Sequence, residues 1–242
     1  MNQRTGALES TILRLFGRRG EVQQVERVGE HFRLITIGGN DLVDRAWTVG
    51  DMTQFSFGGW ESRAYTPLSY DAARGSLEFL GYMHGNGIGS AWLESLRIGD
   101  PCVLVGPRTA VNLDVVTRPA MFFGDETSFS TAAAMRATLH GYRAVSFVFE
   151  VTSPENCAPV LDRLGLDEAT LFRREADDRH LDALERHVLG AFQPSMRAVF
   201  TGKAASIARL YKAARREGIS GKQITNVAYW APGRKGFSGV QR

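Results

Sequence analysis

The pattern of apolar and polar positions changes near the middle of the chain. From about Glu21 to Gly106, short segments rich in β-branched and aromatic residues alternate with turns that contain Gly, Asp or Asn. Strands at this spacing predict a small antiparallel barrel. Apolar residues at helical spacing predict one helix inside this region, from about Ile88 to Leu96. The clearest expected strands are 31–37, 52–57, 63–69, 76–83 and 102–105.

After a linker near Leu113–Pro119, apolar runs alternate with helical segments. This order is typical of an open, parallel α/β sheet, which binds ligands outside the carboxyl ends of its strands. The expected strands are 120–123, 144–151, 196–200 and 223–229, and the expected helices are 128–140, 157–164, 179–189 and 203–217. The fold class is therefore a β-barrel domain followed by an α/β domain.

The first residues have an amphipathic pattern of their own. Leu8, Ile12, Leu15 and Phe16 share one helical face, so we expect an N-terminal helix within residues 1–19. That face would pack on its own domain or on a partner subunit, or it would touch a membrane surface. No apolar run approaches the ~18–20 residues of a membrane span. We expect a cytoplasmic protein without stable membrane insertion, either a monomer or a homodimer.

Composition narrows the possible functions. The 242 residues are 43% hydrophobic and 23% charged, which is ordinary for a globular protein and excludes long disorder and coiled-coil rods. The net charge of +3 is too small to require a nucleic-acid partner. Cys102 and Cys157 have no CxxC partner, which excludes a four-cysteine iron–sulfur cluster; they are free buried thiols or one disulfide. We expect no metal site. The 26 glycines exceed one residue in ten, so glycine-rich turns need attention.

One expected strand carries the first chemical signal. Arg63 and Tyr65 point to one face of that strand, and Ala64 and Thr66 point to the other. Arginine can donate two hydrogen bonds to a phosphate, tyrosine can pack against a planar ring, and threonine can hydrogen-bond the edge of that ring. An ordinary strand that ends at Pro67 has the same residues, so this signal alone leaves both interpretations open.

The segment Tyr82–Trp92 (YMHGNGIGSAW) carries the second signal, a glycine-rich turn before a helix. Glycine allows close approach of a ligand, and a helix N-terminus offers N–H groups and a positive dipole end to an anion. Ser90 adds a hydroxyl. A flexible turn that caps a helix is the alternative, and His84 is then a structural histidine.

The segment Met121–Phe129 (MFFGDETSF) takes an apolar strand into an acidic, hydroxyl-rich helix start. Asp125, Glu126 and Thr127 are either capping residues or ligand contacts. The dinucleotide fingerprint GxGxxG is absent. Near the end of the chain, Tyr229 and Trp230 are either aromatic residues of the core or ring-stacking residues.

Together these motifs resemble a known family. Arg63-x-Tyr65-Thr66, followed about twenty residues later by Gly87-x-x-Ser90, resembles the paired flavin motif of ferredoxin–NADP reductase-like proteins. The segment from His84 to Arg108, with Gly124–Thr127 and Tyr229-Trp230, resembles the siderophore-interacting protein (ferric-siderophore reductase) family. The resemblance extends over nearly the whole chain after Gly20.

This resemblance implies domains and cofactors. Residues 20–113 would form an antiparallel six-stranded FAD-binding β-barrel. Residues 114–242 would form an open parallel α/β domain that binds NADPH or NADH and ends in a basic tail. Arg63 would contact the FAD pyrophosphate, and Thr66 would hydrogen-bond near flavin N5. The full set implied for FAD is Arg63, Ala64, Tyr65, Thr66, Met83, His84, Gly85, Gly87, Gly89 and Ser90.

The resemblance also places residues at the electron donor. Asp125, Glu126 and Thr127 would line the nicotinamide site, and Tyr229 or Trp230 would cover the flavin face. We expect Tyr65, Thr66 and Trp230 to act at the reacting atoms. The cations available for the 2′-phosphate of NADPH are Arg173, Arg174, Lys203 and Arg209. Sequence leaves the choice between NADH and NADPH open.

The implied function is an FAD-dependent reductase that passes electrons from NAD(P)H to Fe(III) in a siderophore or related ferric chelate and releases Fe(II). Arg108, Arg234 and Lys235 are the cations expected to attract the anionic chelate, although Arg234 and Lys235 also fit a solvated tail. Leu68 stands where the family often has Arg, and the segment Thr66–Ser69 is more like a general flavin reductase. The alternatives are therefore a flavin or ferredoxin-type reductase with another acceptor, and a flavin-binding interaction protein without turnover.

Overall fold

A computed structural model of the chain describes residues 15–58, 61–85, 87–113, 116, 119–139 and 145–234. The chain divides into two compact units, Met1–Ala110 (unit 1) and Val111–Arg242 (unit 2), which are described separately below. Most of the predicted N-terminal helix lies outside the described residues. Its predicted end at residue 19 is wrong, because a strand already begins at Gly17 and pairs with a later strand of the barrel.

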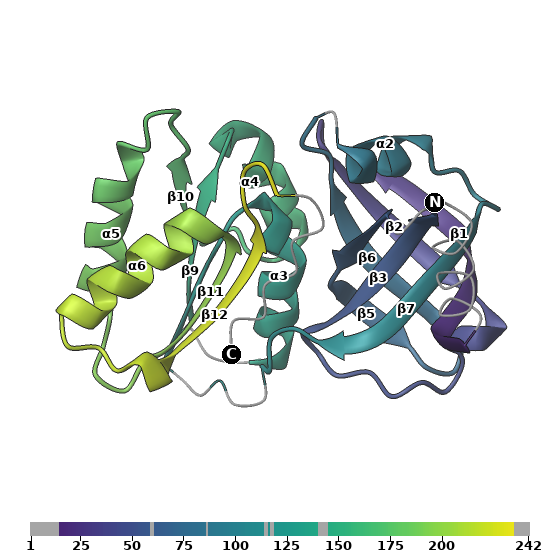
Figure 1. Cartoon of the computed structure of the whole chain (residues 1–242), viewed down its shortest axis with the longest axis horizontal. Coiled ribbons are helices and arrows are strands. Elements are labelled where there is room, and N and C mark those ends of the chain that lie inside the picture. The colour runs from purple at the N-terminus through teal and green to yellow at the C-terminus, as the bar shows by residue number, and fades with distance from the viewer. Residues whose placement is uncertain are drawn as a thin grey trace, which may run out of the picture. The chain divides into compact units, whose positions relative to one another are not determined.

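Unit 1 is an antiparallel sheet (Figure 1). Its strands follow the order β4-β3-β7-β1-β2-β6-β5. The elements are β1 (Gly17–Arg27), β2 (Phe32–Gly38), a 3-10 turn (Asn40–Leu42), β3 (Asp51–Gly58), β4 (Glu61–Tyr65), β5 (Pro67–Asp71), β6 (Ser76–Tyr82), α2 (Ile88–Ser95) and β7 (Pro101–Thr109).

The sheet is closed into a barrel by β4 and β5, which follow each other directly in the chain. β4 pairs with β3 at one end of the strand order, and β5 pairs with β6 at the other end. Only Thr66 separates β4 from β5, so one bent strand joins both edges. Pro67, which has no N–H to donate, begins the second half, where strands tolerate proline. Counting β4 and β5 as one strand gives the six-stranded antiparallel barrel that was predicted.

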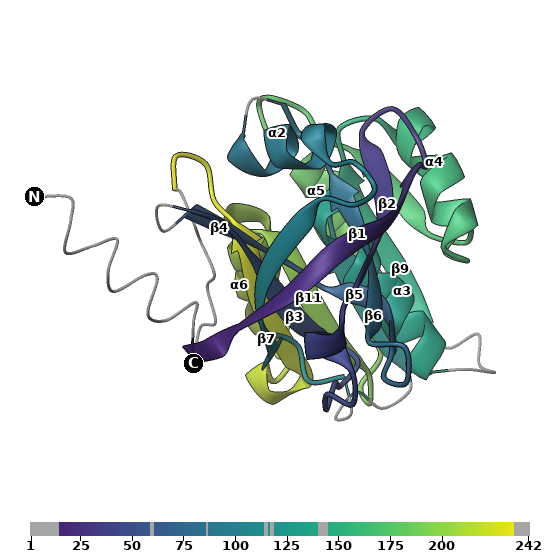
Figure 2. The same cartoon turned by 90° about the vertical axis from the view of Figure 1, so that its right-hand side faces the viewer.

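Helix α2 packs over one end of the barrel (Figures 1 and 2). Its Leu93 is fully buried in the barrel core with Phe55 and Phe79. A Cβ added to Gly81 of β6 would lie 2.4 Å from a methyl carbon of Leu93. Glycine at position 81 therefore lets the helix approach the sheet closely.

We predict that Gly81→Ala destabilises the protein by ~1–3 kcal/mol, because the buried Leu93 cannot move away without shifting α2. Denaturant unfolding followed by circular dichroism measures this change. Gly190→Ala is the matched control, because a Cβ there meets open space and alanine favours a helix, so stability should stay within ~0.5 kcal/mol or rise. Equal effects of the two substitutions would contradict the packing argument.

Unit 2 is a parallel sheet in the order β10-β9-β8-β11-β12, with helices on both faces, so the predicted fold class is confirmed in both units. The order reverses between β8 and β11, as in doubly wound nucleotide-binding folds. Its elements are β8 (Ala120–Gly124), a 3-10 turn (Glu126–Ser128), α3 (Phe129–Thr138), β9 (Val145–Val151), α4 (Pro154–Arg163), β10 (Thr170–Arg173), α5 (His180–Gly190), β11 (Arg197–Lys203), α6 (Ala204–Arg216), a second 3-10 turn (Gly221–Gln223) and β12 (Ile224–Trp230).

Side chains of the central strands pack against helices on both faces of this sheet. Phe123 and Phe200 belong to the core formed with α5 and α6, whereas Phe149 packs edge-to-face with Phe129 of α3.

The sequence did not predict β10, which has only four residues, none of them buried. Cys102 and Cys157 are free and buried, one in each unit. Among the described residues, no helix has the length and apolarity needed to cross a membrane.

Candidate functional site

The candidate site in unit 1 lies where β4 meets the start of α2. A Cβ added to Gly89 would lie 3.0 Å from Cγ of Arg63 and 3.4 Å from the hydroxyl oxygen of Tyr65. Both side chains therefore share one face of β4 and point to the first turn of α2. Ala64 is exposed, and Thr66 is buried at the strand break. The structure thus brings the first two sequence motifs together around Gly89.

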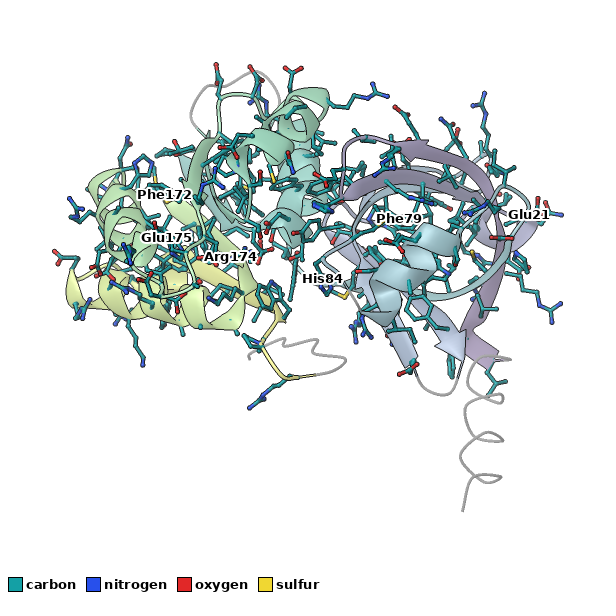
Figure 3. All side chains as sticks on the ribbon, turned by 90° about the horizontal axis from the view of Figure 1, so that it is seen from above. Glu21, Phe79, His84, Phe172, Arg174 and Glu175 are labelled. Carbon is teal, nitrogen blue, oxygen red and sulfur yellow. The ribbon has the colours of Figure 1, made fainter. Side chains whose placement is uncertain are left out.

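The loop between β6 and α2 forms the rim of this site (Figure 3 labels His84). Met83 is buried, and the exposed His84 donates its backbone N–H to Oγ of Ser90 at 3.1 Å. Gly85 has a φ of +109°, which favours glycine, and its carbonyl accepts from the N–H of Gly87 at 2.9 Å. Ser90 therefore fixes the loop through its hydroxyl oxygen, in addition to any role at a ligand.

The first turn of α2 is built to receive an anion. Its N-cap residue is Gly87, and no side chain of the described residues caps the helix. The first N–H groups of a helix have no partner inside the helix and carry its positive dipole end. The Arg63 guanidinium donates through Nη1 to the carbonyl of Ser62 at 2.7 Å, and within the described part of the chain its other N–H groups are left for a ligand. A diphosphate fits this combination of donors.

Tyr65 supplies an aromatic ring that is held rigidly. Its ring centroid lies 4.8 Å from that of Phe79, 5.8 Å from Phe55 and 5.9 Å from Trp92. Burial raises the pKa of Tyr65 far above its ordinary value, and the nearby charge of Arg63 only partly opposes this effect. The phenol therefore keeps its proton at neutral pH. A planar ligand ring could pack against this residue.

A second concavity in unit 1 has another explanation. It measures about 420 Å³ and is lined by Val25, Arg27, Arg33, Leu96, Arg97 and Ile98. Arg33 donates to the carbonyl of Leu93, and Arg97 donates to the carbonyls of Glu94, Ser95 and Leu96. These arginines cap the C-terminal end of α2 by donating to carbonyls that lack partners inside the helix. This concavity is therefore a structural feature of the helix end.

In unit 2, Asp125 occupies the point where the strand order reverses. It follows β8, and its carboxylate would lie 2.5 Å from a Cβ added to Gly202 of β11. Gly202 has a φ of +98°, so glycine is favoured there by both backbone and space. Asp125 accepts from the N–H of Thr127 at 2.9 Å and from Nε1 of Trp230 at 2.6 Å. The residue thus caps the turn, as one sequence interpretation expected, and also holds Trp230.

Glu126 belongs to a buried ion network. It accepts from the backbone N–H of Thr152 at 2.6 Å and from Nη2 of Arg174 at 2.9 Å. Arg174, which follows β10, also donates to Oε1 of Glu150 at 3.1 Å (Figure 3 labels Arg174). Only 2% of the Glu126 side chain and none of the Glu150 side chain is exposed. Through these contacts Glu126 holds the backbone after β9 and the side chain of Arg174 in place.

Glu150 links this network to the core of unit 2. Its Oε1 accepts from Oγ of Ser206 at 3.0 Å, and its Oε2 lies 3.4 Å from Nε2 of His180. The N–H of Glu175 donates to Nδ1 of His180 at 3.1 Å. Nδ1 is therefore the acceptor nitrogen, and the ring proton sits on Nε2, facing Glu150.

The two late aromatic residues have different surroundings. The Tyr229 hydroxyl lies 2.8 Å from Oγ1 of Thr131 in α3, which ties Tyr229 to the core. The Trp230 indole is held by Asp125, and the guanidinium carbon of Arg174 lies 5.7 Å from its ring centroid. Trp230 thus lies at the carboxyl edge of the sheet, where doubly wound folds bind ligands.

The cations expected to bind a 2′-phosphate or a ferric chelate differ in their surroundings. Each of the four cations considered for a 2′-phosphate already binds a carboxylate, so their part in binding NADPH stays a prediction: Arg173 binds Glu155, Arg174 binds Glu126 and Glu150, Lys203 binds Asp178, and Arg209 binds Asp182 and Glu185. Arg108 and Arg234 are exposed, and Nη2 of Arg108 lies 3.3 Å from Sδ of Met52. Lys235 lies outside the described residues. Within those residues, no group of three or more His, Cys, Asp or Glu could hold a metal ion.

Sequence reasoning missed the residues that organise the edge of unit 2. Arg174 was noted only as a cation, and Glu150, His180 and Gly202 were not singled out. One signal was available: Glu150 interrupts an otherwise apolar strand, and a charge in a buried strand needs a partner. The partners of Glu150 come from distant segments, so spacing along the chain could not identify them.

Burial raises the pKa of Asp125 to about 6, and the negative charge of Glu126 raises it further. Hydrogen bonds from Thr127 and Trp230 and the positive charge of Arg174 act in the opposite direction. In the unfolded chain the carboxyl has its ordinary pKa near 3.8. As the pH rises, the unfolded state therefore loses its proton first. The stability contributed by the protonated carboxyl is complete below about pH 4 and is lost as the pH rises to about 6.

We predict that wild type loses ~2 kcal/mol of unfolding free energy relative to Asp125→Asn between about pH 4 and pH 6, because the variant cannot titrate there. Denaturant unfolding of both proteins across this range measures the change. The constant offset caused by the lost hydrogen bond cancels in the comparison. A difference that does not vary with pH would contradict the prediction.

Comparisons with known proteins agree with this geometry. A family model of the oxidoreductase FAD-binding domain matches residues 52–113, which include Arg63–Thr66 and the loop before α2. No curated protein matches the chain. A siderophore utilization protein from T. fusca has a similar fold, with a TM-score of 0.73, 21% identity, and coverage of 92% of this chain and 95% of that one.

Two further solved structures share the fold. The siderophore-interacting protein SipS from Aeromonas hydrophila has a TM-score of 0.74 and 16% identity, and the match covers 91% of this chain and 93% of that one. The ferredoxin reductase in carbazole 1,9a-dioxygenase has a TM-score of 0.71 and 16% identity, with coverage of 88% and 69%.

These findings define the class: the protein has an FAD-binding oxidoreductase fold, with the FAD-binding domain in unit 1. Within that class, its fold is shared with siderophore-interacting proteins and ferredoxin reductase-like flavoproteins, which confirms the resemblance that the motifs indicated.

Proposed function

We propose that this protein is an FAD-dependent reductase that takes electrons from NADH or NADPH and delivers them to Fe(III) in a siderophore or related ferric chelate, releasing Fe(II). The observation that carries the proposal is the close approach at Gly89, which places Arg63, Tyr65 and an uncapped helix N-terminus together. A diphosphate joined to a planar ring system matches these groups in charge and shape.

In this proposal Arg63 and the N–H groups of Gly89 and Ser90 in the first turn of α2 bind the FAD diphosphate, while the N–H of Gly87 holds the loop through the Gly85 carbonyl. Tyr65 packs against the flavin or its ribityl chain, and Thr66 hydrogen-bonds the flavin edge. Bound FAD supplies the conversion of a two-electron donor into one-electron steps. The protein supplies placement and charge, and no side chain needs to act as a general acid or base.

Unit 2 would bind the nicotinamide donor at the carboxyl edge of its sheet. Thr127 and the ring of Trp230 are the groups we assign to that contact. The buried carboxylates of Asp125 and Glu126 hold the turn and the ring in place. Since the four cations considered above bind carboxylates, they give no reason to expect a strong preference for NADPH over NADH.

The acceptor is assigned from the relatives and from charge. Two relatives of similar length are described as siderophore utilization and siderophore-interacting proteins. Arg108, Arg234 and Lys235 would attract an anionic ferric chelate, and a cytoplasmic location would provide the nicotinamide donor. The ferredoxin reductase among the relatives favours a protein electron carrier as the second candidate acceptor.

We expect the FAD-loaded protein to lose its flavin absorbance under anaerobic conditions when NADH or NADPH is added. Adding a ferric siderophore should then restore the absorbance faster than adding oxidised ferredoxin, and a ferrous chelator should report Fe(II). Persistence of the flavin absorbance with both nucleotides would exclude the reductase and leave a binding protein. Faster reoxidation by ferredoxin would identify the second candidate.

Arg63→Ala should weaken FAD binding about tenfold or more, because the variant loses charge-assisted hydrogen bonds to the diphosphate. Flavin content after gel filtration and a fluorescence titration with FAD measure this loss. Arg74→Ala is the control, since Arg74 is an exposed arginine of unit 1 that pairs with Asp71. If both variants retain FAD equally well, Arg63 does not bind the diphosphate.

A further inference from the structure

Arg174 joins several segments of unit 2 at the carboxyl edge of the sheet. Besides its bonds to Glu126 and Glu150 Oε1, it donates to the Glu150 carbonyl at 2.8 Å and to Oγ1 of Thr152 at 3.0 Å. Its backbone N–H donates to the carbonyl of Val151 at 2.7 Å. One side chain therefore connects the segments that follow β8, β9 and β10, and only 18% of it is exposed.

The same guanidinium also lies over the ring of Trp230. The distance from its central carbon to the ring centroid is 5.7 Å, which is within the range of a cation–π contact. On the other side, the indole N–H donates to Oδ2 of Asp125 at 2.6 Å. Because one contact fixes the edge of the indole and the other covers its face, the ring has little freedom to rotate.

The charge balance of this cluster makes Arg174 hard to replace. Two buried carboxylates, Glu126 and Glu150, bind the guanidinium, and the buried Asp125 adds a third negative charge that acts on it. Burial alone would lower the pKa of Arg174, but the charges of Glu126 and Asp125 raise it above its ordinary value. The guanidinium thus stays charged at every pH at which the protein is folded.

We propose that Arg174 is the positioning residue of the electron-donor site: its hydrogen bonds hold the turns after β8 and β9, and its cation–π contact holds the Trp230 indole, so that the nicotinamide meets a preformed surface. This inference rests on the proposed function. Arginine suits both tasks, because its three nitrogens can bond several acceptors at once while its cation also contacts a ring. Lysine would keep the charge, but its single nitrogen could not bond Glu126, Glu150 and Thr152 and also lie over the indole.

The competing explanation is that Arg174 only neutralises buried carboxylates. In that case Arg174→Lys would lower stability but leave the Trp230 ring and the electron donor unaffected. The two explanations therefore differ in the environment of Trp230 and in the kinetics per folded, FAD-loaded molecule. Arg216→Lys is the matched control, since Arg216 is exposed and pairs with Glu185 at the surface of α6.

The first readout is the accessibility of Trp230, measured by acrylamide quenching of tryptophan fluorescence. Each protein is compared with its own Trp230→Phe derivative, which isolates Trp230 from the other tryptophans. We expect Arg174→Lys to raise the quenching constant of Trp230 and Arg216→Lys to leave it unchanged. An unchanged constant in Arg174→Lys would overturn the proposal, whatever the thermal stability does.

The second readout is the rate at which NADH or NADPH reduces the bound FAD in an anaerobic stopped-flow experiment. We expect Arg174→Lys to lower this rate by about tenfold or more at unchanged FAD content, because misplacement of a positioning group costs rate. A wild-type rate in Arg174→Lys would overturn the positioning role. If wild type itself is not reduced, the proposed function fails, and the quenching experiment still decides whether Arg174 holds Trp230.

A second variant covers the case in which Arg174→Lys does not fold. Glu126→Gln keeps the charge of Arg174 but weakens one of its anchors at 2.9 Å. We expect the same direction of change, with easier quenching of Trp230 and slower reduction. Wild-type values for both quantities in Glu126→Gln would contradict the proposal.

Discussion

The contact between α2 and the closing strand of the barrel is the constraint on which the candidate flavin site depends. Gly89 allows the helix start to lie against Arg63 and Tyr65, and Gly81 allows Leu93 to fill the barrel end below it. Because α2 is anchored by a buried leucine, its uncapped N-terminus is held in one place. A flexible glycine-rich turn would offer the same donors without fixing them. Placement of donors, more than their number, makes this end of the barrel suitable for a diphosphate.

In unit 2, a network of buried carboxylates with Arg174 and Trp230 organises the carboxyl edge of the sheet. The carboxylate of Asp125 fills the space above Gly202 at the point where the strand order reverses, and Trp230 and Arg174 complete the arrangement. Three buried carboxylates would be costly without Arg174 and the hydrogen-bond donors around them. The edge is consequently an internally satisfied polar network. In such a network the acidic residues shape the surface that a ligand meets, and they need not touch the ligand themselves.

The sequence predicted the fold well because both halves follow strong periodic patterns. The strands around Phe55, Phe79, Phe123 and Phe200, and the helix α2, lie close to where the apolar periodicity placed them. The prediction failed where the pattern is short or overridden. The four-residue β10 has too few apolar positions to stand out, and Gly17 starts a strand because β7 provides a pairing edge that the local sequence does not reveal.

The candidate site was predicted in part. The motif residues Arg63, Tyr65 and Gly89 share one location in the structure, as their spacing and the family resemblance implied. The Glu150–Arg174–Trp230 network was not predicted, because its members lie on β9, after β10 and on β12, and only the parallel sheet brings those strand ends together. Long-range pairing of this kind leaves no periodic signal in one sequence.

The most direct test of this account is a comparison of FAD, FMN and riboflavin as ligands of the full-length apoprotein, measured by the quenching of flavin fluorescence. If Arg63 and the start of α2 bind a diphosphate, FAD should bind about tenfold or more tightly than FMN, and riboflavin should bind most weakly. Equal affinities for FAD and riboflavin would contradict the assignment of the diphosphate to this end of the barrel.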